Sequence, residues 1–298
     1  MIKPDKMKIA VYGKKITAEF FPYFQLMCEK FRQYGAEVLM YRELYENVAH
    51  NFDYQVSHNY LFEQHSDLDK DIDFLLSVGG DGTFLESVSF VRKSLIPIIG
   101  INSGRLGFLA TISRENISES IDAIFSRKFT LEKRSLIELV NPSGVLKEFP
   151  FALNEFAVQK KGTGMISIEV TMGGNHLNTY WADGLIISTP TGSTGYSMSV
   201  GGPIVIPGSK NFILSPIAPH NLTVRPMVIP DDHELTVRVS TRQDAYWVSM
   251  DSRSEVYTGY APLKIRKAGI FIHVLKLEGM DYFETLRSKL MWGADKRG

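Results

Sequence analysis

Two hydrophobic patterns alternate along the first part of the chain, one typical of buried strands and one typical of helices. Short, continuous apolar runs typical of buried parallel strands occur at residues 8–12, 36–41, 73–78 and 96–101. Apolar side chains recur at helical spacing in residues 18–34, 84–93 and 113–127, and Ser113 is a candidate N-cap of the last of these helices. We predict a helix and a surface loop for the polar residues 42–70. This alternation predicts an α/β, Rossmann-like first domain with a parallel sheet, in which ligands lie at the carboxyl ends of the strands.

The pattern changes near residue 129. Short runs typical of strands, separated by Gly, Pro, Asn and Asp, occur at residues 136–140, 151–159, 166–172, 185–188, 235–239, 246–250 and 270–277. They predict a β-rich, β-sandwich-like second domain over residues 129–280. Helical spacing returns at residues 281–292 and predicts a closing C-terminal helix. We expect this helix to return to the first domain, which would then comprise residues 1–128 and 281–298.

Length and composition agree with two domains. The chain has 298 residues, and 44% of them are hydrophobic, which is enough for two cores. Its 33 basic and 33 acidic residues balance, which argues against nucleic acid or a membrane as a partner. The single cysteine, Cys28, lies in a helical stretch and is interpreted as a core residue. With no signal-peptide pattern and no long apolar run, the sequence predicts a soluble, cytoplasmic protein.

A glycine-rich turn follows the apolar run at residues 73–78. It reads Gly79-Gly80-Asp81-Gly82-Thr83 and precedes a predicted helix. Glycines allow backbone N–H groups to approach a ligand, and a helix N-terminus favours negative charge, so the turn suits a phosphate. An acid beside a polyanion either holds a metal ion or accepts a proton from an attacking hydroxyl, and both are kinase roles. A tight turn with an Asp N-cap explains the same residues equally well.

A second loop, residues 102–109, also follows a predicted strand. It reads Asn102-Ser103-Gly104-Arg105-Leu106-Gly107-Phe108-Leu109, and Arg105 is its candidate residue. Because neighbouring parallel strands end at the same edge of a sheet, we expect this loop to lie beside the Gly79–Thr83 turn. Arg105 could then direct positive charge toward a phosphate, or it could simply be solvated.

The second half contains a segment that strand formation alone does not explain. Residues 182–203 are rich in glycines and small hydroxyl residues, and Tyr196 offers a face on which a base could stack. Asn154 and Glu155 interrupt an apolar run, and a polar pair in a half-buried strand requires hydrogen-bond partners. Ribose hydroxyls and base edges would supply them. Either piece alone would be explained by a Ser/Thr-rich turn or a satisfied Asn.

These motifs, taken together, resemble the NAD kinase family. The resemblance rests on GGDGTFL from Gly79, the Asn154-Glu155 pair, residues 183–196 with TPTGSTGY, and residues 219–226 with PHNL and RP. It covers roughly residues 73 to 255. The glycine-acid turn is weakly specific, because diacylglycerol kinases, sphingosine kinases and phosphofructokinases carry similar turns. The TPTGSTGY segment makes the resemblance specific.

The resemblance implies transfer of the ATP γ-phosphate to the 2′-hydroxyl of the adenosine ribose of NAD, which gives NADP. It implies that Asp81 contacts this hydroxyl as general base or orienting group, and that the phosphate site is shaped by Gly79, Gly80, Gly82 and Thr83. It implies that Asn154 and Glu155 hold the adenosine and that Asp183 faces the nicotinamide end. It also implies a pocket lined by Thr194, Gly195, Tyr196 and Ser199.

The same resemblance implies the ligands and the assembly. Magnesium is expected to arrive with ATP and bridge its phosphates, without a metal site formed by protein residues alone. Family members are usually homo-oligomers, so we expect a homodimer or homotetramer with contacts through the β-rich half.

This chain departs from the usual family pattern at three positions. Gly195 replaces a usual alanine, Asp251-Ser252-Arg253 replaces Asp-Gly-Gln or Asp-Gly-Arg, and Trp181 stands where basic residues are common. We therefore leave residues 251–253 out of the predicted site, and the preference between NAD and NADH open.

Three alternatives share some of these features. A lipid kinase or a sugar kinase would share the Asp81 turn, but the Asn154-Glu155 pair and the hydroxyl-rich loop argue against both. A regulatory module that binds nucleotides without catalysis is the third alternative, and the presence of Asp81 argues against it.

Overall fold

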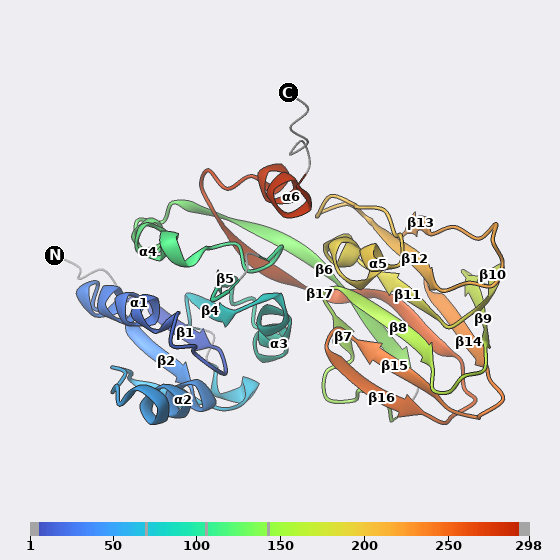
Figure 1. The fold of residues 1–298 in the computed structure, drawn as a ribbon, viewed down its shortest axis with the longest axis horizontal. Helices are drawn as coiled ribbons and strands as arrows, with labels where there is room; N and C mark the ends of the chain where they lie inside the picture. Colours follow the sequence, from blue (N-terminus) through green and yellow to red (C-terminus); the bar gives the residue numbers. More distant parts are fainter. Residues whose placement is uncertain (1–5, 69–70, 105–106, 142–143, 292–298) are drawn as a thin grey trace. The chain divides into compact units, whose positions relative to one another are not determined.

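The computed structural model describes residues 6–68, 71–104, 107–141 and 144–291. The chain divides into two compact units (Figure 1), Met1–Lys133 with Ile272–Gly298, and Arg134–Phe271. Two long strands, β6 (Phe129–Asn141) and β17 (Leu263–Leu277), each pass from one unit into the other. The boundaries between units therefore fall inside strands, and the domain limits 1–128, 129–280 and 281–298 stay a prediction.

The first unit is an α/β unit. Its parallel strands lie in the order β5-β4-β1-β2-β3. Strand β17 lies next to β5, where Val274 pairs with Ile98. The strands are β1 (Lys8–Tyr12), β2 (Glu37–Tyr41), β3 (Tyr60–Phe62), β4 (Phe74–Gly79) and β5 (Ile98–Asn102). The helices are α1 (Phe21–Gln33), α2 (Arg42–Phe52), α3 (Asp81–Val91), α4 (Ile117–Phe125) and α6 (Tyr282–Leu290), with short 3-10 turns η1 (His65–Asp67) and η2 (Arg114–Asn116).

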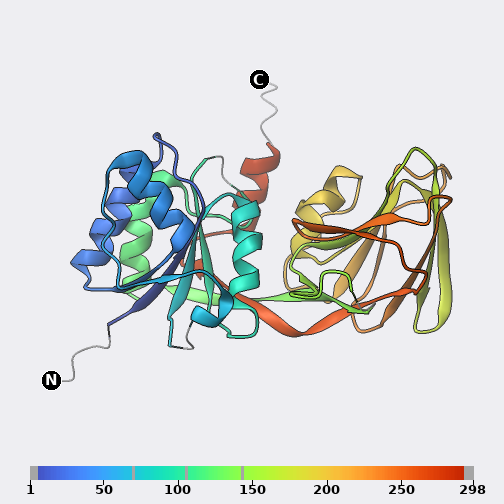
Figure 2. The same cartoon turned by 90° about the horizontal axis from the view of Figure 1, so that it is seen from below.

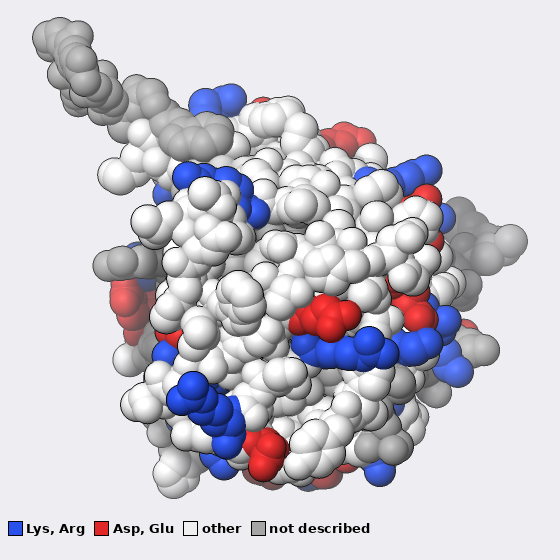
Figure 3. Space-filling model, turned by 90° about the vertical axis from the view of Figure 1, so that its right-hand side faces the viewer, with Lys and Arg blue, Asp and Glu red and all other residues white. Residues whose placement is uncertain are grey.

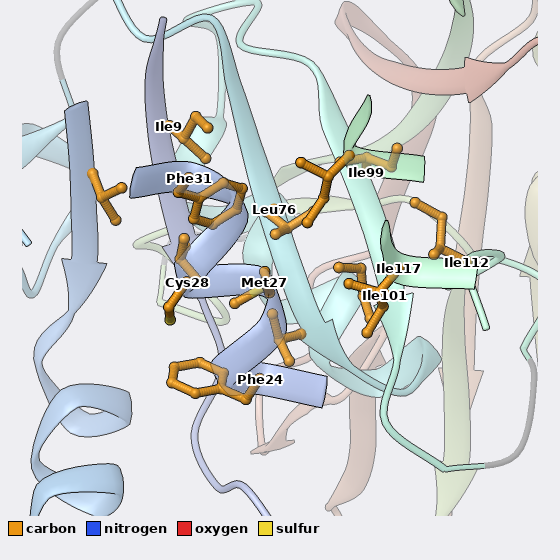
Figure 4. Packing of buried hydrophobic residues seen from close by; sticks show 14 of the residues in the cluster. Ile9, Phe24, Met27, Cys28, Phe31, Leu76, Ile99, Ile101, Ile112 and Ile117 are labelled. Carbon is orange, nitrogen blue, oxygen red and sulfur yellow. The ribbon is translucent and has the colours of Figure 1, made fainter. Parts of the chain in front are cut away.

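The sheet of this unit is covered on both faces. On one face α1 and α4 lie side by side over the sheet, and Phe24, Met27 and Ile117 pack against strand residues of the main core (Figures 2 and 4). On the other face α3 contributes Phe90, which packs against Tyr12 of β1. Burial of strands on both faces explains their continuous apolar runs.

The second unit is a β-sandwich. One sheet has the order β13-β12-β11-β8-β15-β16, and the other contains β10, β9, β14 and the first part of β17, with β6 and β7 attached. Both sheets contribute to one core, through residues such as Phe156 and Leu185 from the first and Ile168 and Val237 from the second. The strands are β7 (Phe151–Ala152), β8 (Glu155–Lys160), β9 (Ile166–Met172), β10 (Asn175–Ala182), β11 (Gly184–Ser188), β12 (Asn211–Ile217), β13 (Met227–Pro230), β14 (Leu235–Ser240), β15 (Tyr246–Met250) and β16 (Arg253–Tyr257). A 3-10 turn η3 (Thr191–Thr194) and a short helix α5 (Tyr196–Ser199) follow β11.

The predicted α/β unit, β-rich unit and C-terminal helix are confirmed, with local differences. Helix α3 begins at Asp81, three residues before the predicted start at Phe84. Ser113 is the N-cap residue of η2, which leads into α4, but its side chain makes no cap hydrogen bond, and the N-cap of α4 itself is Asn116. Helix α6 is capped by Asp281, whose side chain accepts the N–H of Phe283; Trp292, the predicted end of the helix, lies outside the described residues. In the described part of the chain, no helix combines the length and apolarity needed to cross a bilayer.

Candidate active site

The Gly79–Thr83 turn joins the end of β4 to the start of α3. A Cβ atom on Gly79 would lie 2.2 Å from Oγ1 of Thr83, so the close turn requires glycine at this position. Gly80 is the N-cap in extended conformation, and neither Gly80 nor Gly82 has a heavy atom near the place of a Cβ. The first backbone N–H groups of a helix have no intrahelical acceptor, so this turn can present them to an anion.

Asp81 is bound by the neighbouring loop. Its Oδ2 accepts the backbone N–H of Phe108 at 2.8 Å, and its Oδ1 accepts those of Leu109 and Ala110, each at 3.0 Å. A Cβ on Gly107 would lie 1.8 Å from Oδ1 of Asp81, so only glycine allows the loop to approach this closely.

The backbone joins the same two segments, because the N–H of Ser103 donates to the carbonyl of Gly79 at 3.2 Å. The expectation that the 102–109 loop lies beside the turn is confirmed. Arg105, the predicted phosphate contact in that loop, lies outside the described residues.

These contacts test the N-cap interpretation of Asp81. The N-cap of α3 is Gly80, Asp81 is the first residue of the helix, and no side chain caps the helix. The N-cap explanation is therefore wrong. Each carboxylate oxygen can accept about two hydrogen bonds. Because Oδ2 accepts one N–H bond and Oδ1 accepts two, Oδ2 keeps capacity for one more donor, such as a hydroxyl.

A charged cluster lies beside the same helix. Glu86 of α3 accepts hydrogen bonds from Lys14 Nζ at 2.8 Å and from the Tyr12 hydroxyl at 3.0 Å. The hydrogen bond to Glu86 raises the pKa of Lys14, and burial, followed by the charge of Glu86, raises the pKa of Tyr12. Lys14 therefore stays protonated, and its charge is compensated by Glu86.

In the second unit, the hydroxyl-rich loop packs on the break between β7 and β8. The Thr189 N–H donates to the Asn154 carbonyl at 2.8 Å, and the Thr189 hydroxyl donates to the Leu153 carbonyl at 2.6 Å. The Thr189 hydroxyl also accepts the N–H of Gly192 at 3.1 Å. A Cβ on Gly192 would lie 2.1 Å from the Asn154 carbonyl oxygen, so this contact requires glycine. The predicted strand at 151–159 is therefore wrong in one respect, since it is interrupted where the loop attaches.

Asn154 and Glu155 present unpaired polar atoms at this contact. Oδ1 of Asn154 and Oε2 of Glu155 are buried and have no hydrogen-bond partner among the described residues. A Cβ on Gly195 would lie 3.3 Å from both Asn154 Nδ2 and Glu155 Oε2, so these side chains point toward the start of α5. Buried polar atoms without partners are rare, and atoms of this kind suit a ligand with hydroxyl and amino groups.

Glu155 has an altered protonation equilibrium. Burial, and next the charge of Asp251, raise the pKa of Glu155 from 4.5 to about 8. No N–H donor of the described protein offsets this effect at its Oε2. At neutral pH the side chain is therefore mostly a neutral acid, which loses its proton more readily when a hydrogen-bond donor approaches.

This pKa makes stability depend on pH. Unfolded Glu155 loses its proton near pH 4.5, whereas the folded form keeps it up to about pH 8, so the free energy of unfolding falls as pH rises across this window. Glu155→Gln removes the effect. We expect the variant to be more stable than wild type by on the order of 3 kcal/mol at pH 8.5, and much closer to wild type at pH 5. Urea unfolding at both pH values measures the difference.

Glu169→Gln is the matched control for this prediction. Glu169 is a partly exposed side chain on β9 in the same unit, 3.9 Å from Arg238. A surface pair of this kind contributes little, so Glu169→Gln should follow wild type at both pH values. An equal stability difference between Glu155→Gln and wild type at pH 5 and pH 8.5 would contradict the assignment.

The remaining predicted residues extend the site along β8 and β11. Asp183 directly precedes β11 and forms an ion pair with Lys160 at 2.7 Å. Ser188, at the other end of β11, lies opposite Glu155 of β8 in the sheet. With about 3.3 Å per residue, these two ends of β11 lie about 13 Å apart. Tyr196 of α5 is 39% exposed, and its hydroxyl accepts a hydrogen bond from Gln159 at 2.9 Å, near the Asp183 end.

The last two predicted residues lie at the ends of the loop that follows β11. Thr194 is half-buried, and its hydroxyl donates to the carbonyl of Thr191 in its own turn at 3.4 Å, whereas Ser199 is exposed at the end of α5. The structure thus brings Asn154, Glu155 and Gly195 together, and it separates them from Asp183 along the strand.

Sequence reasoning missed two parts of the site. One is the Phe108–Ala110 backbone, which binds Asp81, and the other is Asp251, which binds the backbone at Asn154. Gly107 could have indicated the first of these parts, because a glycine there allows the loop to approach Asp81 closely. For the second, an acid at a strand end in the β-rich half was a signal, but it was left out because Asp251-Ser252-Arg253 departs from the usual family pattern at Ser252.

Comparison with known proteins agrees with this arrangement. A family model described as the N-terminal domain of ATP-NAD kinases matches residues 17–129, and one for the C-terminal domain matches residues 153–262. NAD kinases of Flavobacterium psychrophilum and Bacteroides fragilis are 45% and 42% identical to this chain, over 98% of it and 100% of each relative.

Two solved structures resemble the chain over nearly its whole length. Yeast NADH kinase complexed with NADH has a TM-score of 0.85 at 20% identity and covers 99% of this chain and 90% of its own, which is a likeness of fold. An NAD kinase from Archaeoglobus fulgidus in complex with ATP has a TM-score of 0.72 at 27% identity, over 96% of this chain and 99% of its own. Fold and site define a nucleotide-binding protein of the kinase class. The chain belongs to the ATP-NAD kinase family.

Proposed function

We propose that this chain is an NAD kinase that transfers the γ-phosphate of ATP, bound with Mg²⁺, to the 2′-hydroxyl of the adenosine ribose of NAD. The observation that carries the proposal is the pair of buried, unpaired polar atoms, Asn154 Oδ1 and Glu155 Oε2, beside the hydroxyl-rich loop. An adenosine moiety offers both donors and acceptors to such a pair. Membership of the ATP-NAD kinase family supports the same reaction.

Asp81 is the group that orients the attacking hydroxyl and receives its proton. The backbone N–H groups of Phe108, Leu109 and Ala110 fix the carboxylate, and Oδ2 retains capacity for one more donor. A fixed carboxylate needs little rearrangement when the hydroxyl arrives, and phosphoryl transfer depends chiefly on positioning and charge stabilisation.

The phosphate and dinucleotide groups each have a set of residues. The phosphates of ATP meet the glycine turn and the start of α3, through Gly79, Gly80, Gly82 and Thr83. The bound Mg²⁺ belongs to the ATP substrate and bridges its phosphates. The dinucleotide is held by Asn154, Glu155, Asp183, Thr194, Gly195, Tyr196 and Ser199. The separation of Asp183 from Glu155 along β11 favours an extended ligand, with the nicotinamide end toward Asp183.

A homo-oligomer, either a dimer or a tetramer, is the expected assembly. Uncharged side chains predominate on the face shown in Figure 3. Exposed apolar residues of the second unit include Met165, Trp181, Leu222 and Val228. Exposed apolar surface of this kind is typical of protein contacts. The cytoplasmic location stays a prediction.

A coupled assay tests the reaction. Purified protein, ATP, Mg²⁺ and NAD should yield NADP, detected with an NADP-specific dehydrogenase. NADH and polyphosphate in place of NAD and ATP define the acceptor and the donor. Well-folded protein that binds NAD, and that forms neither NADP from NAD nor NADPH from NADH with either donor, would reject the kinase proposal and favour a binding module.

A further inference from the structure

A tight turn in the second unit forms hydrogen bonds with the backbone of the candidate site at Leu153, Asn154 and Glu155. It joins β15 to β16 and contains Asp251, whose φ of +52° lies in the left-handed region. Oδ2 of Asp251 accepts the N–H of Leu153 at 2.8 Å, and Oδ1 accepts those of Asn154 at 2.8 Å and Glu155 at 3.2 Å. In return, the Asp251 N–H donates to the Glu155 carbonyl at 3.0 Å. Four hydrogen bonds thus join this turn to three consecutive residues.

These three residues need an acceptor from outside the sheet. Strand β7 ends at Ala152 and β8 begins at Glu155, so the intervening backbone leaves the regular ladder. A backbone N–H that is removed from water without an acceptor costs about 1–3 kcal/mol. One carboxylate satisfies all three N–H groups, and hydrogen bonds to a charged acceptor are the stronger kind. The direction in which the Asn154 and Glu155 side chains leave the backbone therefore depends on Asp251.

We propose that Asp251 is a positioning residue for dinucleotide binding: its carboxylate fixes the backbone from which Asn154 and Glu155 extend, and it places a negative charge next to Glu155, whose backbone N–H it binds. The inference rests on the proposed function, which assigns Asn154 and Glu155 to the dinucleotide. It gives Asp251 a role through the backbone, because its carboxylate accepts the N–H groups of Leu153, Asn154 and Glu155.

The charges around Glu155 support this role. From the β15–β16 turn, Asp251 faces Glu155 and raises its pKa. Two other elements face Glu155. Ser188 of β11 lies opposite it in the sheet, and Gly195 at the start of α5 lies near its side chain; neither residue is charged. Burial raises the pKa of Asp251 above its usual value, and the three N–H donors and Arg253 offset part of that rise. Three N–H groups bind the carboxylate of Asp251, whereas no donor binds Oε2 of Glu155 among the described residues. Of these two acids, Asp251 therefore carries the negative charge and Glu155 carries the proton.

Proton release follows from this distribution. A ribose hydroxyl that donates to Glu155 binds the ionised carboxylate more strongly than the neutral acid, so NAD binding below about pH 8 should release a proton. The dissociation constant for NAD should then rise by up to tenfold for each pH unit below 8 and level off above it. Without the charge of Asp251, Glu155 ionises at lower pH, and the break in the profile should move to lower pH as well.

The test is calorimetric titration of NAD into wild type and Asp251→Asn between pH 6 and 9, in two buffers of different ionisation enthalpy. For the variant we expect at least tenfold weaker NAD binding at pH 8.5, a break shifted to lower pH, and ATP binding within twofold of wild type. A purely structural role would weaken binding without moving the break. Wild-type NAD affinity together with an unmoved break would overturn the inference.

Two further variants make the test secure. Asp231→Asn is the matched control, because Asp231 is a buried carboxylate of the same unit that pairs with Lys267 at 2.8 Å, and its NAD profile should follow wild type. If Asp251→Asn does not fold, Asp251→Glu carries the test. It retains the charge and misplaces the oxygens, so the break should stay and NAD affinity should fall at least threefold. Unchanged affinity in that variant would overturn the inference. Failure of the proposed function is distinguishable, since wild type would then form no NADP.

Discussion

Asp81→Asn should reduce the turnover number for NADP formation by about 10³-fold, while NAD still binds. A positioned group that accepts the proton of the attacking hydroxyl typically contributes 10²- to 10⁴-fold. The expected loss corresponds to about 4 kcal/mol of transition-state stabilisation. An amide can still accept the N–H groups of Leu109 and Ala110 through its oxygen, but its NH₂ group would face the N–H of Phe108. The variant therefore loses both the base and part of the loop contact.

Glu86→Gln is the matched control. Glu86 is another acid of α3, and it pairs with Lys14 and Tyr12 rather than with the 107–110 loop. Its turnover should stay within about fivefold of wild type. Initial rates at saturating ATP and NAD, together with calorimetric binding of NAD, separate turnover from affinity. An Asp81→Asn enzyme that retains more than a tenth of wild-type turnover would remove Asp81 from the chemical step.

The parts of the fold predicted from sequence are those defined by local periodicity. The runs at 8–12 and 246–250 coincide with β1, a short and mostly buried strand, and with β15, which alternates between buried and more exposed positions. Strand β10 was not predicted, because Asn175, His176 and Asn178 interrupt its alternation and most of the strand is only partly buried. The long strand β17 was predicted only from residue 270, because Arg266 and Lys267 obscure its pattern.

The site divides in the same way. The glycines and Asp81 are read from one short turn, so the sequence was sufficient to nominate them. Their partners at 108–110 lie 27 to 29 residues away, and the hydrogen bonds from Leu153 and Asn154 to Asp251 span 98 and 97 residues. No local pattern encodes such contacts, because they depend on which strands become neighbours in the sheet. Sequence therefore identifies the groups that face the ligand more readily than the groups that hold them.

Gly192→Ala should disrupt the dinucleotide site more than a glycine-to-alanine substitution at any other position of this loop. The new Cβ would lie 2.1 Å from the Asn154 carbonyl oxygen and 2.5 Å from its carbon, and both are backbone atoms that cannot rotate away. The loop would have to move off the β7–β8 break and would strain the hydrogen bonds of Thr189 to Leu153 and Asn154. We expect a loss of about 3 kcal/mol or more in the free energy of unfolding, which lowers the melting temperature by roughly 10 °C. Thermal unfolding and NAD titration measure both effects, and NAD binding should fall below detection.

Gly195→Ala, three residues later, separates this clash from a general intolerance of the loop. Its Cβ would meet the Gly192 carbonyl oxygen at 3.2 Å and the ends of the Asn154 and Glu155 side chains at 3.3 Å, and side chains can yield by a few tenths of an ångström. The backbone of Gly195 has a negative φ of −93°, so alanine introduces no left-handed strain. We expect a change in stability within about 1 kcal/mol and NAD affinity within about tenfold of wild type. Because the two glycines differ mainly in whether backbone or side-chain atoms face the new methyl group, equal loss in both variants would show that the loop responds to added volume rather than to its contact with Asn154.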